Sequence, residues 1–197
     1  MTMTPSEAAA ILVDSGELRT ERLIYRLPDP SLAPALSDYY GRNGEHFAPY
    51  SPRRPDGFHS IEAWQERALG LRQASLTGKA LHVLISLRAD TSGDIVGDIN
   101  FTNVVRGALQ AAYLGYELDR AHVGRGLMGE AAAACIDHVF RYMNLHRLMA
   151  NYVPSNERSG RLLRKLGFSV EGYARDYLFL DGVWKDHILT SLINPNF

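Results

Sequence analysis

The sequence is poor in cysteine and lysine. It contains one cysteine, Cys135, and three lysines, Lys79, Lys165 and Lys185, among 197 residues. A single cysteine excludes an intramolecular disulfide and is typical of a chain that works in a reducing compartment. Cys135 falls on the apolar side of a predicted helix, which favours a role in the core. Lysine and arginine together number 21, so the other 18 basic residues are arginines. Genomic base composition explains this excess better than phosphate binding does.

Long apolar runs and a large net charge are also absent. The longest apolar run near the N-terminus, Ala8 to Val13, is too short to span a membrane and lacks the basic flank of a signal peptide. The net charge of −1 creates no field that would attract nucleic acid or an anionic membrane. The sequence therefore predicts a cytoplasmic protein with no direct nucleic-acid or membrane partner.

Seven consecutive residues carry the strongest chemical signal in the chain. They are Gly124, Arg125, Gly126, Leu127, Met128, Gly129 and Glu130. Glycines let backbone N–H groups converge without Cβ clashes, and the first turn of a helix offers unpaired N–H donors and a partial positive charge. Together with the guanidinium of Arg125, this glycine turn predicts a cradle for a phosphate or pyrophosphate.

The glycines also match the Gly-x-Gly-x-x-Gly pattern of dinucleotide-binding Rossmann domains, but their surroundings do not. That fold needs a buried apolar strand that runs directly into the glycines, and an acidic residue roughly 20 positions later. The preceding strand pattern, Tyr113 to Leu118, stops several residues short and contains Glu117. Asn151 stands where the acid is expected. The sequence therefore disfavours a Rossmann fold.

Hydrophobic periodicity predicts a mixed order of strands and helices. Strands are predicted at residues 23–27, 81–87, 95–103, 109–118, 147–153, 168–178 and 183–192, and helices at residues 31–42, 60–78, 127–143 and 155–166. In the third strand Ile95, Gly97, Ile99 and Phe101 are expected to share one face. Residues 1–20 are predicted to be a tail or peripheral helix, 21–197 a single domain, and 43–58 an irregular segment within it.

The glycine turn, its helix and the polar start of the next helix resemble the GNAT superfamily of acetyl-CoA-dependent N-acetyltransferases. In that family a Gln/Arg-x-x-Gly-x-Gly/Ala motif surrounds the cofactor pyrophosphate, and an asparagine at the next helix start contacts the cofactor. The matching positions are Val123, Gly126 and Met128, with Asn156 as the asparagine. Val123 and Met128 depart from the motif, but the backbone N–H of Met128 is still available.

Further segments resemble the RimJ/RimL branch of ribosomal protein alanine N-acetyltransferases, and the RimJ type most. They are residues 103–107, 113–116, 149–152, 171–174 and 181–187, within a resemblance that covers roughly residues 20–192. The resemblance implies an α/β (α+β) GNAT-like fold, with a mixed, mostly antiparallel twisted sheet of about seven strands and about four helices. It also implies acetyl-CoA as co-substrate, no metal, and acetylation of a protein N-terminus. The implied acceptor is an Ala-initiated small-subunit ribosomal protein, with transient ribosome contact.

The same resemblance assigns the cofactor-binding residues. In the family, the strand before the glycine turn diverges from its neighbour and pairs with the pantetheine amides, which places Tyr116, Glu117 and Leu118 against the cofactor. The other expected contacts are Val123, Gly124, Arg125, Gly126, Leu127, Met128, Gly129, Asn151, Asn156 and Ser159.

A proton donor for the leaving thiolate is less obvious. Many family members use a tyrosine seven residues after the asparagine, and this position holds Leu163, which has no proton to donate. Ser159 is the substitute that the RimL-like branch suggests. Tyr173 and Tyr177 are further candidates.

No general base stands out, because the carboxylate of some family members maps to Ala112. The ordinary pKa of an α-amine is about 7.7–8.0 against about 10.4 for lysine, so deprotonating lysine costs about 3.4 kcal/mol more. A site without a strong base therefore suits an N-terminal amine. The remaining base candidates are Glu117, Glu171, Asp176 and the Asp186–His187 pair.

Two other functions remain open. One is acetylation of small amines such as polyamines or aminoglycosides, which a strongly acidic acceptor pocket would favour. The other is a non-catalytic role in ribosome assembly or regulation. Acceptor specificity is expected to come from the aromatic, proline-rich loop at residues 46–54 and from the final hairpin, whose turn is predicted at Asp181–Gly182.

Overall fold

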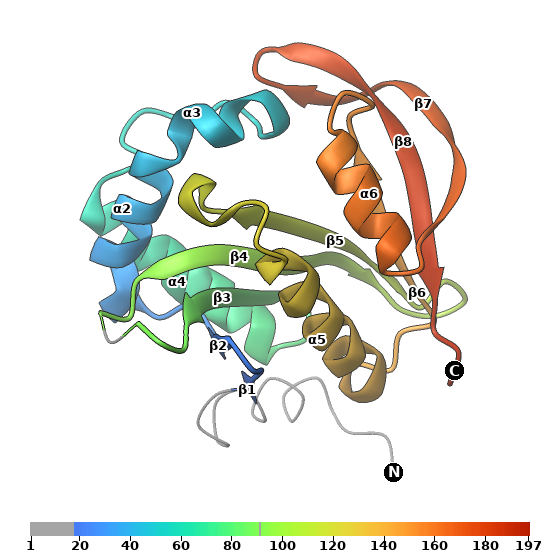
Figure 1. Cartoon of the computed structure of the whole chain (residues 1–197), viewed down its shortest axis with the longest axis horizontal. Helices are drawn as coiled ribbons and strands as arrows, with labels where there is room; N and C mark the ends of the chain where they lie inside the picture. The colour runs from blue at the N-terminus through green and yellow to red at the C-terminus, as the bar shows by residue number, and fades with distance from the viewer. Residues whose placement is uncertain (1–17, 91) are drawn as a thin grey trace.

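The computed structural model describes residues 18–90 and 92–197, and one eight-stranded sheet forms its centre (Figure 1). The strands are β1 (Leu18–Arg19), β2 (Leu23–Arg26), β3 (Leu81–Leu87), β4 (Ile95–Val105), β5 (Ala111–Leu118), β6 (Arg147–Tyr152), β7 (Ser169–Leu180) and β8 (Val183–Ile193). Their order is β1-β2-β3-β4-β5-β6-β8-β7. The β5–β6 pair is parallel and the other neighbours are antiparallel. The predicted mixed, mostly antiparallel sheet is confirmed, with one strand more than expected.

Helices cover both faces of this sheet. They are α2 (Ala33–Arg42), the short α3 (Gly44–Phe47), α4 (Ile61–Leu76), α5 (Leu127–Tyr142) and α6 (Glu157–Lys165), with 3-10 turns at Pro30–Leu32, Ala48–Tyr50 and Arg120–His122. Apolar side chains of α2 and α4 pack against Leu84 and Ile95 on one face, and those of α5 and α6 pack on the other. In the view of Figure 1, α5 lies in front of the sheet and α4 behind it.

Two segments differ from the sequence prediction. Leu18 and Arg19, expected in the tail, form β1 and pair with β2. Two residues are too few to show an alternating pattern, so the sequence does not reveal this strand. The rest of the predicted tail lies outside the described residues. The segment at 43–58, predicted to be irregular, contains α3 and a 3-10 turn.

A β-bulge changes which residues of β4 share a face. Ile85 lies opposite Gly97, but Ser86 lies opposite Ile95, so the β4 strand carries an extra residue at this point. The bulge moves Ile95 to the face covered by α2 and α4, away from Ile99, and the prediction that the two share a face is wrong. Asp98 and Asn100, the polar residues on either side of Ile99, therefore face α2 and α4 as well.

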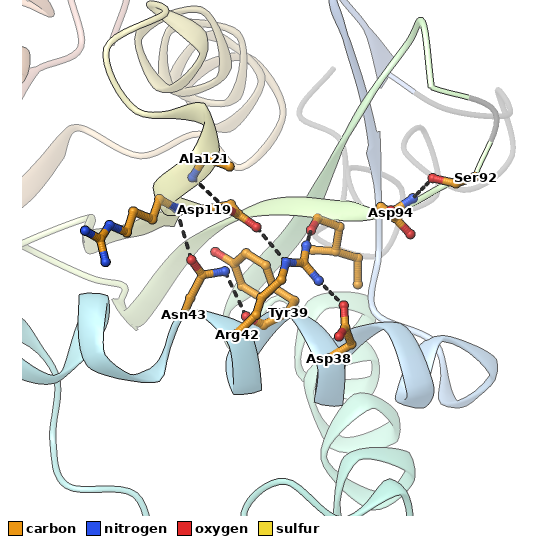
Figure 2. A network of polar contacts seen from close by, with 10 residues as sticks. Asp38, Tyr39, Arg42, Asn43, Ser92, Asp94, Asp119 and Ala121 are labelled. Carbon is orange, nitrogen blue, oxygen red and sulfur yellow. Dashed lines mark hydrogen bonds and ion pairs between the residues drawn. The ribbon is translucent and has the colours of Figure 1, made fainter.

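A partly buried ionic network ties α2 to the end of β5 (Figure 2). The Arg42 Nε donates to Asp119 Oδ2 at 2.7 Å, and the backbone N–H of Arg120 donates to Asn43 Oδ1 at 3.0 Å. Asp119 is only 5% exposed. Its burial acts to raise its pKa, but hydrogen bonds from the Ala121 N–H and Arg42 outweigh burial and lower the pKa. The network fixes the start of the loop that leads to the glycine turn.

We expect Arg42→Ala to lower the free energy of unfolding by about 3 kcal/mol, because it leaves the Asp119 carboxylate and the Ile95 carbonyl without this partner. Urea unfolding would measure the change. The matched control is Arg141→Ala, which removes an exposed pair with Asp137 and should cost less than about 0.5 kcal/mol. Because the pKa of Asp119 is lowered in the folded state, its contribution is lost as pH falls, so the effect of Arg42→Ala should shrink below about pH 3.9. Equal stability of the two variants at pH 7 would contradict this account.

Candidate active site

The sheet opens into a cleft where β5 and β6 separate. These strands pair only from Ala111 to Tyr113 on β5 and from Arg147 to Met149 on β6, whereas β6 remains paired with β8 up to Tyr152. The cleft that begins at this gap has a volume of about 1220 Å³. Small-molecule sites usually occupy roughly 300–1,000 Å³. The space therefore suffices for two substrates at once.

The register between β4 and β5 decides which backbone groups face the gap. The N–H of Asp119 donates to the Val96 carbonyl at 2.9 Å, and hydrogen-bonded pairs alternate along an antiparallel ladder. The backbone of Glu117 is therefore directed toward β4, and that of Tyr116 and Leu118 toward the gap. The prediction that the Glu117 backbone contacts a cofactor is not supported by this register, although its side chain does line the cleft.

The glycine turn forms one end of the cleft. Gly124 and Gly126 have φ angles of +83° and +75°, which residues with a Cβ rarely adopt. Gly126 precedes the first residue of α5, and no side chain caps this helix start. The N–H donors of the first turn thus lack a side-chain acceptor, which is the arrangement that binds anions.

Arg22, in the turn between β1 and β2, holds the glycine turn. Its Nη1 donates to the carbonyl of Arg125 at 2.9 Å, and its Nε donates to Glu130 Oε2 at 2.6 Å. This contact fixes the peptide between the two glycines. The side chain of Arg125 is exposed and lies outside the cleft lining, contrary to the predicted role of its guanidinium in the cradle.

The other predicted cofactor-binding residues gather around the cleft. The lining contains Tyr116, Glu117, Leu118, Val123, Gly124, Gly126, Leu127, Met128, Gly129, Asn151, Asn156 and Ser159. The side chain of Met128 is buried in the core, so only its backbone is available to a ligand. The amide of Asn151 donates to the Tyr177 hydroxyl at 3.1 Å. Asn156 caps α6 by accepting from the Ser159 N–H at 3.2 Å. These contacts show how the side chains are held, and their contact with a cofactor stays a prediction.

Two predicted site residues form a direct pair. The hydroxyls of Tyr116 and Ser159 hydrogen-bond at 2.6 Å across the cleft from β5 to α6. Burial raises the pKa of Tyr116 to about 12, against the opposing effect of its hydrogen bond with Ser159. The phenol is therefore neutral at physiological pH and has a proton to donate. Sequence patterns place the Tyr116 backbone in the site but do not indicate this role for its side chain.

Two predicted catalytic residues lie elsewhere. Tyr173 and Asp176 are exposed on β7 and are not part of the cleft lining. Both contact Asp186, through the Tyr173 hydroxyl and the Asp176 N–H. A register shift between β7 and β8, with Asp176 at a φ of +46°, turns this part of the strand away from the cleft. Their predicted catalytic roles have no support in this geometry.

The structure brings a carboxyl group to the cleft that sequence reasoning missed. Asp98 on β4 is 6% exposed and lines the cleft, and its Oδ1 accepts from Asn100 Nδ2 at 3.1 Å. Burial, reinforced by the charge of Glu117, raises the pKa of Asp98 to about 7. Alternation along β4 marks Asp98 as polar-facing, which normally indicates a solvent-exposed face. Only the packing of α2 and α4 over that face makes the residue buried.

Neither a metal centre nor a membrane helix is evident in the described part of the chain. No group of three or more His, Cys, Asp or Glu residues at 18–90 and 92–197 is arranged to hold a metal ion. Over the same residues, no helix combines the length and the hydrophobicity needed to cross a bilayer.

Comparison with known proteins gives consistent matches. Residues 22–169 match the family model described as an acetyltransferase (GNAT) domain. The chain is 42% identical over 185 residues to the [Ribosomal protein uS5]-alanine N-acetyltransferase of Escherichia coli (strain K12), covering 94% of each chain.

Two solved structures share the fold. One is the ribosomal-protein-S5-alanine acetyltransferase of Vibrio fischeri, with a TM-score of 0.86 and 37% identity over 91% of this chain and 97% of that one. The other is Mycobacterium smegmatis RimJ in complex with CoA-disulfide, with a TM-score of 0.81 and 30% identity over 89% of this chain and 83% of that one. The open β5–β6 gap, the glycine turn and these matches together show that this chain belongs to the GNAT family of N-acetyltransferases.

Proposed function

We propose that this protein transfers the acetyl group of acetyl-CoA to the N-terminal α-amine of a protein, and that the acceptor is an alanine-initiated ribosomal protein of the uS5 type. The observation that carries the proposal is the near full-length similarity to the Escherichia coli enzyme. The acetyl transfer itself is common to the family, whereas the acceptor of this chain is the proposed part.

The residues of the cleft fit acetyl-CoA. A pyrophosphate needs converging N–H donors, and the turn at Gly124 and Gly126 offers them without a Cβ over the site. A Cβ added at Gly124 would meet no atom within 4 Å, so the space above the turn is open. The pantetheine amides need strand-like partners, and the backbone of Tyr116 and Leu118 is not paired with a neighbouring strand on the gap side, although the backbone of Leu118 has a hydrogen bond with His46. Acetyl-CoA would supply the activated acetyl group at the end of this gap.

The Tyr116–Ser159 pair would return a proton to the departing thiolate. An ordinary thiol has a pKa of about 8.5, and the pKa of Tyr116 is raised to about 12. The phenol is therefore protonated over the whole physiological range. Its hydrogen bond to Ser159 orients both hydroxyls in the cleft. The pair thus replaces the tyrosine that many relatives carry at the position of Leu163, which is buried here.

The charges of the cleft disfavour a polyamine acceptor. Ligands with several positive charges require a strongly acidic site. The charged groups in the described lining, histidines aside, are Arg54, Arg67, Arg158 and Arg161 against Asp98 and Glu117. An acceptor with one ammonium group fits two adjacent carboxylates better than a spermidine-like chain does.

Two matched peptides would test the acceptor class by thiol release from acetyl-CoA. One peptide has a free N-terminal alanine and no lysine, and the other has a blocked N-terminus and one internal lysine. We expect turnover with the first only, because its α-amine loses a proton at a cost about 3.4 kcal/mol lower. Turnover with the second only would refute the proposal in favour of a side-chain acetyltransferase. If neither peptide reacts, a small amine or a non-catalytic role becomes the better explanation.

A further inference from the structure

The negative charge of the cleft is concentrated at one place beside the gap. Asp98 and Glu117 are the acidic residues in the described lining, and they are direct partners across the β4–β5 ladder. Tyr116 and Leu118, on either side of Glu117, are the residues whose backbone faces the gap. The two carboxylates therefore lie next to the segment where the acetyl group is expected.

We propose that Asp98 binds the α-ammonium group of the acceptor and accepts its proton, with Glu117 held beside it as a second negative charge. This inference rests on the proposed function and adds the general base that neither the sequence nor the family match assigns. It also predicts on which side of the sheet the acceptor enters, because Asp98 lies on the face covered by α2 and α4.

The two carboxylates have different partners, which suggests a division of roles. Glu117 Oε1 accepts from the Ser51 hydroxyl at 2.6 Å and from Arg54 Nη2 at 3.3 Å. An ion pair and a hydroxyl donor of this kind hold the side chain in place. Asp98 has one described hydrogen bond, from Asn100 to Oδ1, and none is described for Oδ2. Glu117 Oε2 likewise has no described partner, but no ion pair is described for Asp98, so Asp98 is the carboxylate that a cation does not already hold.

The groups around Asp98 leave little positive charge to compete with an ammonium ion. Burial raises the pKa values of the phenols on α2 and of the thiol on α5, and Asp98 reinforces all three shifts, so these groups are uncharged at neutral pH. Burial also lowers the pKa of His82 on β3 to about 4, so its imidazole is neutral. Arg54 is the cation that acts on Asp98, and it is already paired with Glu117. The groups on the same face as Asp98 are Tyr39, Tyr40, Arg54, His82 and Glu117, whereas Cys135 acts on it from α5 across the sheet.

A buried indole supplies the complementary donor. Trp64 on α4 is 3% exposed and lines the cleft, and its Nε1 has no hydrogen-bond partner within the described residues. Its ring stacks on Tyr40 with centroids 4.7 Å apart, which fixes its position. A carboxylate and an unpaired N–H donor in one cleft match the ammonium and first carbonyl of a peptide N-terminus. The same two groups do not match a hydrocarbon amine, which has no carbonyl.

The proposed proton transfers balance. Asp98 takes one proton from the ammonium, which leaves a neutral amine with a lone pair. The amine nitrogen forms the new bond to the acetyl carbon, and the carbon–sulfur bond breaks. The Tyr116–Ser159 pair gives a proton to the thiolate, and the second proton lost by the nitrogen restores that pair. Asp98 releases its proton to water, which is the one proton that acetylation of an ammonium ion produces. With its pKa raised to about 7, Asp98 is close to an α-amine at about 7.7–8.0, a match that favours transfer.

The test compares wild type with Asp98→Asn on the alanine-initiated peptide between pH 6 and 9. We expect kcat/KM at pH 8 to fall by about 100- to 1,000-fold, as for loss of a general base. In the wild type kcat/KM should rise through an inflection near pH 7, and the variant should lack this inflection. The dissociation constant of acetyl-CoA should stay within about twofold, because Asp98 lies outside the glycine turn. Asp137→Asn, an exposed carboxylate on α5, is the matched control and should change neither quantity.

Stability separates loss of the base from loss of the fold. A raised pKa means that the folded state resists ionisation of Asp98, so this group costs stability once pH rises above its unfolded value of about 3.9 and most fully above pH 7. Asp98→Asn removes that cost. The urea midpoint of the variant should therefore be higher than that of wild type at pH 8 and similar at pH 4. A less active but more stable protein is the expected combination.

Other outcomes would overturn the inference. His187 also lines the cleft, and its Nδ1 hydrogen-bonds to the Lys185 carbonyl at 2.9 Å, which leaves Nε2 as a possible acceptor. If His187→Gln abolishes the inflection near pH 7 and Asp98→Asn retains it, His187 is the base. If the wild type is active and Asp98→Asn is equally active, the role of Asp98 is contradicted but the proposed function is not. A wild type that acetylates no N-terminal peptide contradicts the proposed function and this inference together.

Discussion

Acetyl-CoA should bind at least about 100-fold more weakly to a Gly126→Asp variant than to the wild type. Gly126 has a φ of +75°, so any side chain there is strained by about 1–2 kcal/mol. The added side chain would begin 3.7 Å from Arg22 Nη2, so its carboxylate would compete for the guanidinium that holds the turn, and several charge-assisted hydrogen bonds of the disturbed cradle, worth about 1.5–3 kcal/mol each, would be lost. Calorimetric titration with acetyl-CoA measures the dissociation constant directly.

Gly107→Asp provides the matched control for this prediction. Gly107 also has a φ of +75°, and a Cβ there would meet no atom within 4 Å. The residue lies in the turn between β4 and β5, outside the cleft lining. The control therefore has the same backbone strain and the same new charge, but acetyl-CoA should bind it as it binds wild type. Similar affinities for the two variants would refute the glycine turn as the pyrophosphate site.

Tyr116→Phe should lower kcat by about 100- to 1,000-fold, the range expected when a proton donor is lost. The substitution keeps the ring that packs beside the core and removes only the hydroxyl that bonds Ser159. Because burial raises the pKa of Tyr116 to about 12, the wild-type donor should not lose its proton below about pH 10, so the wild-type rate should not decline up to that pH. Steady-state rates at saturating acetyl-CoA would show both effects.

A double-mutant cycle shows whether Tyr116 and Ser159 contribute to kcat together or independently. If Tyr116 and Ser159 act together, adding Ser159→Ala to Tyr116→Phe should cost much less than Ser159→Ala alone. The comparison variant is Tyr173→Phe, since Tyr173 was a proton-donor candidate on sequence grounds but lies outside the cleft. Its activity should equal that of wild type. Loss of activity in Tyr173→Phe, with Tyr116→Phe fully active, would reverse the assignment.

Local sequence patterns were sufficient to predict the glycine turn and the start of the helix at Asn156. The glycine turn and the Asn156 cap depend on a few consecutive residues, and their chemistry can be read without knowing the rest of the fold. Ser159 lies one turn after Asn156 on the same helix, so its place in the cleft follows from helical spacing. The gap beside Tyr116 was expected from the family resemblance, and the pairing of β5 with β6 shows such a gap.

The acceptor half depends on packing that no local pattern contains. Asp98 becomes buried only because α2 and α4 cover the polar side of β4. Tyr173 and Asp176 lie outside the cleft lining on a strand whose pairing with β8 has two register shifts, and such shifts leave the alternation of residue types unchanged. Pairings between distant segments decided both cases, and a single sequence does not reveal them.

Because Arg22 holds the glycine turn, the proposed acetyl-CoA site depends on the β1–β2 edge of the sheet. The bonds of Arg22 to Arg125 and Glu130 join residues 103 and 108 positions apart in the chain. The side-chain hydrogen bond described for the Arg125 carbonyl comes from Arg22. We therefore expect the glycine turn to take its final geometry only after β1 and β2 have joined the sheet, and to lose it when these strands detach. A protease cut or a shortened N-terminus at this edge would impair the cofactor site from a distance, without altering any residue that lines the cleft.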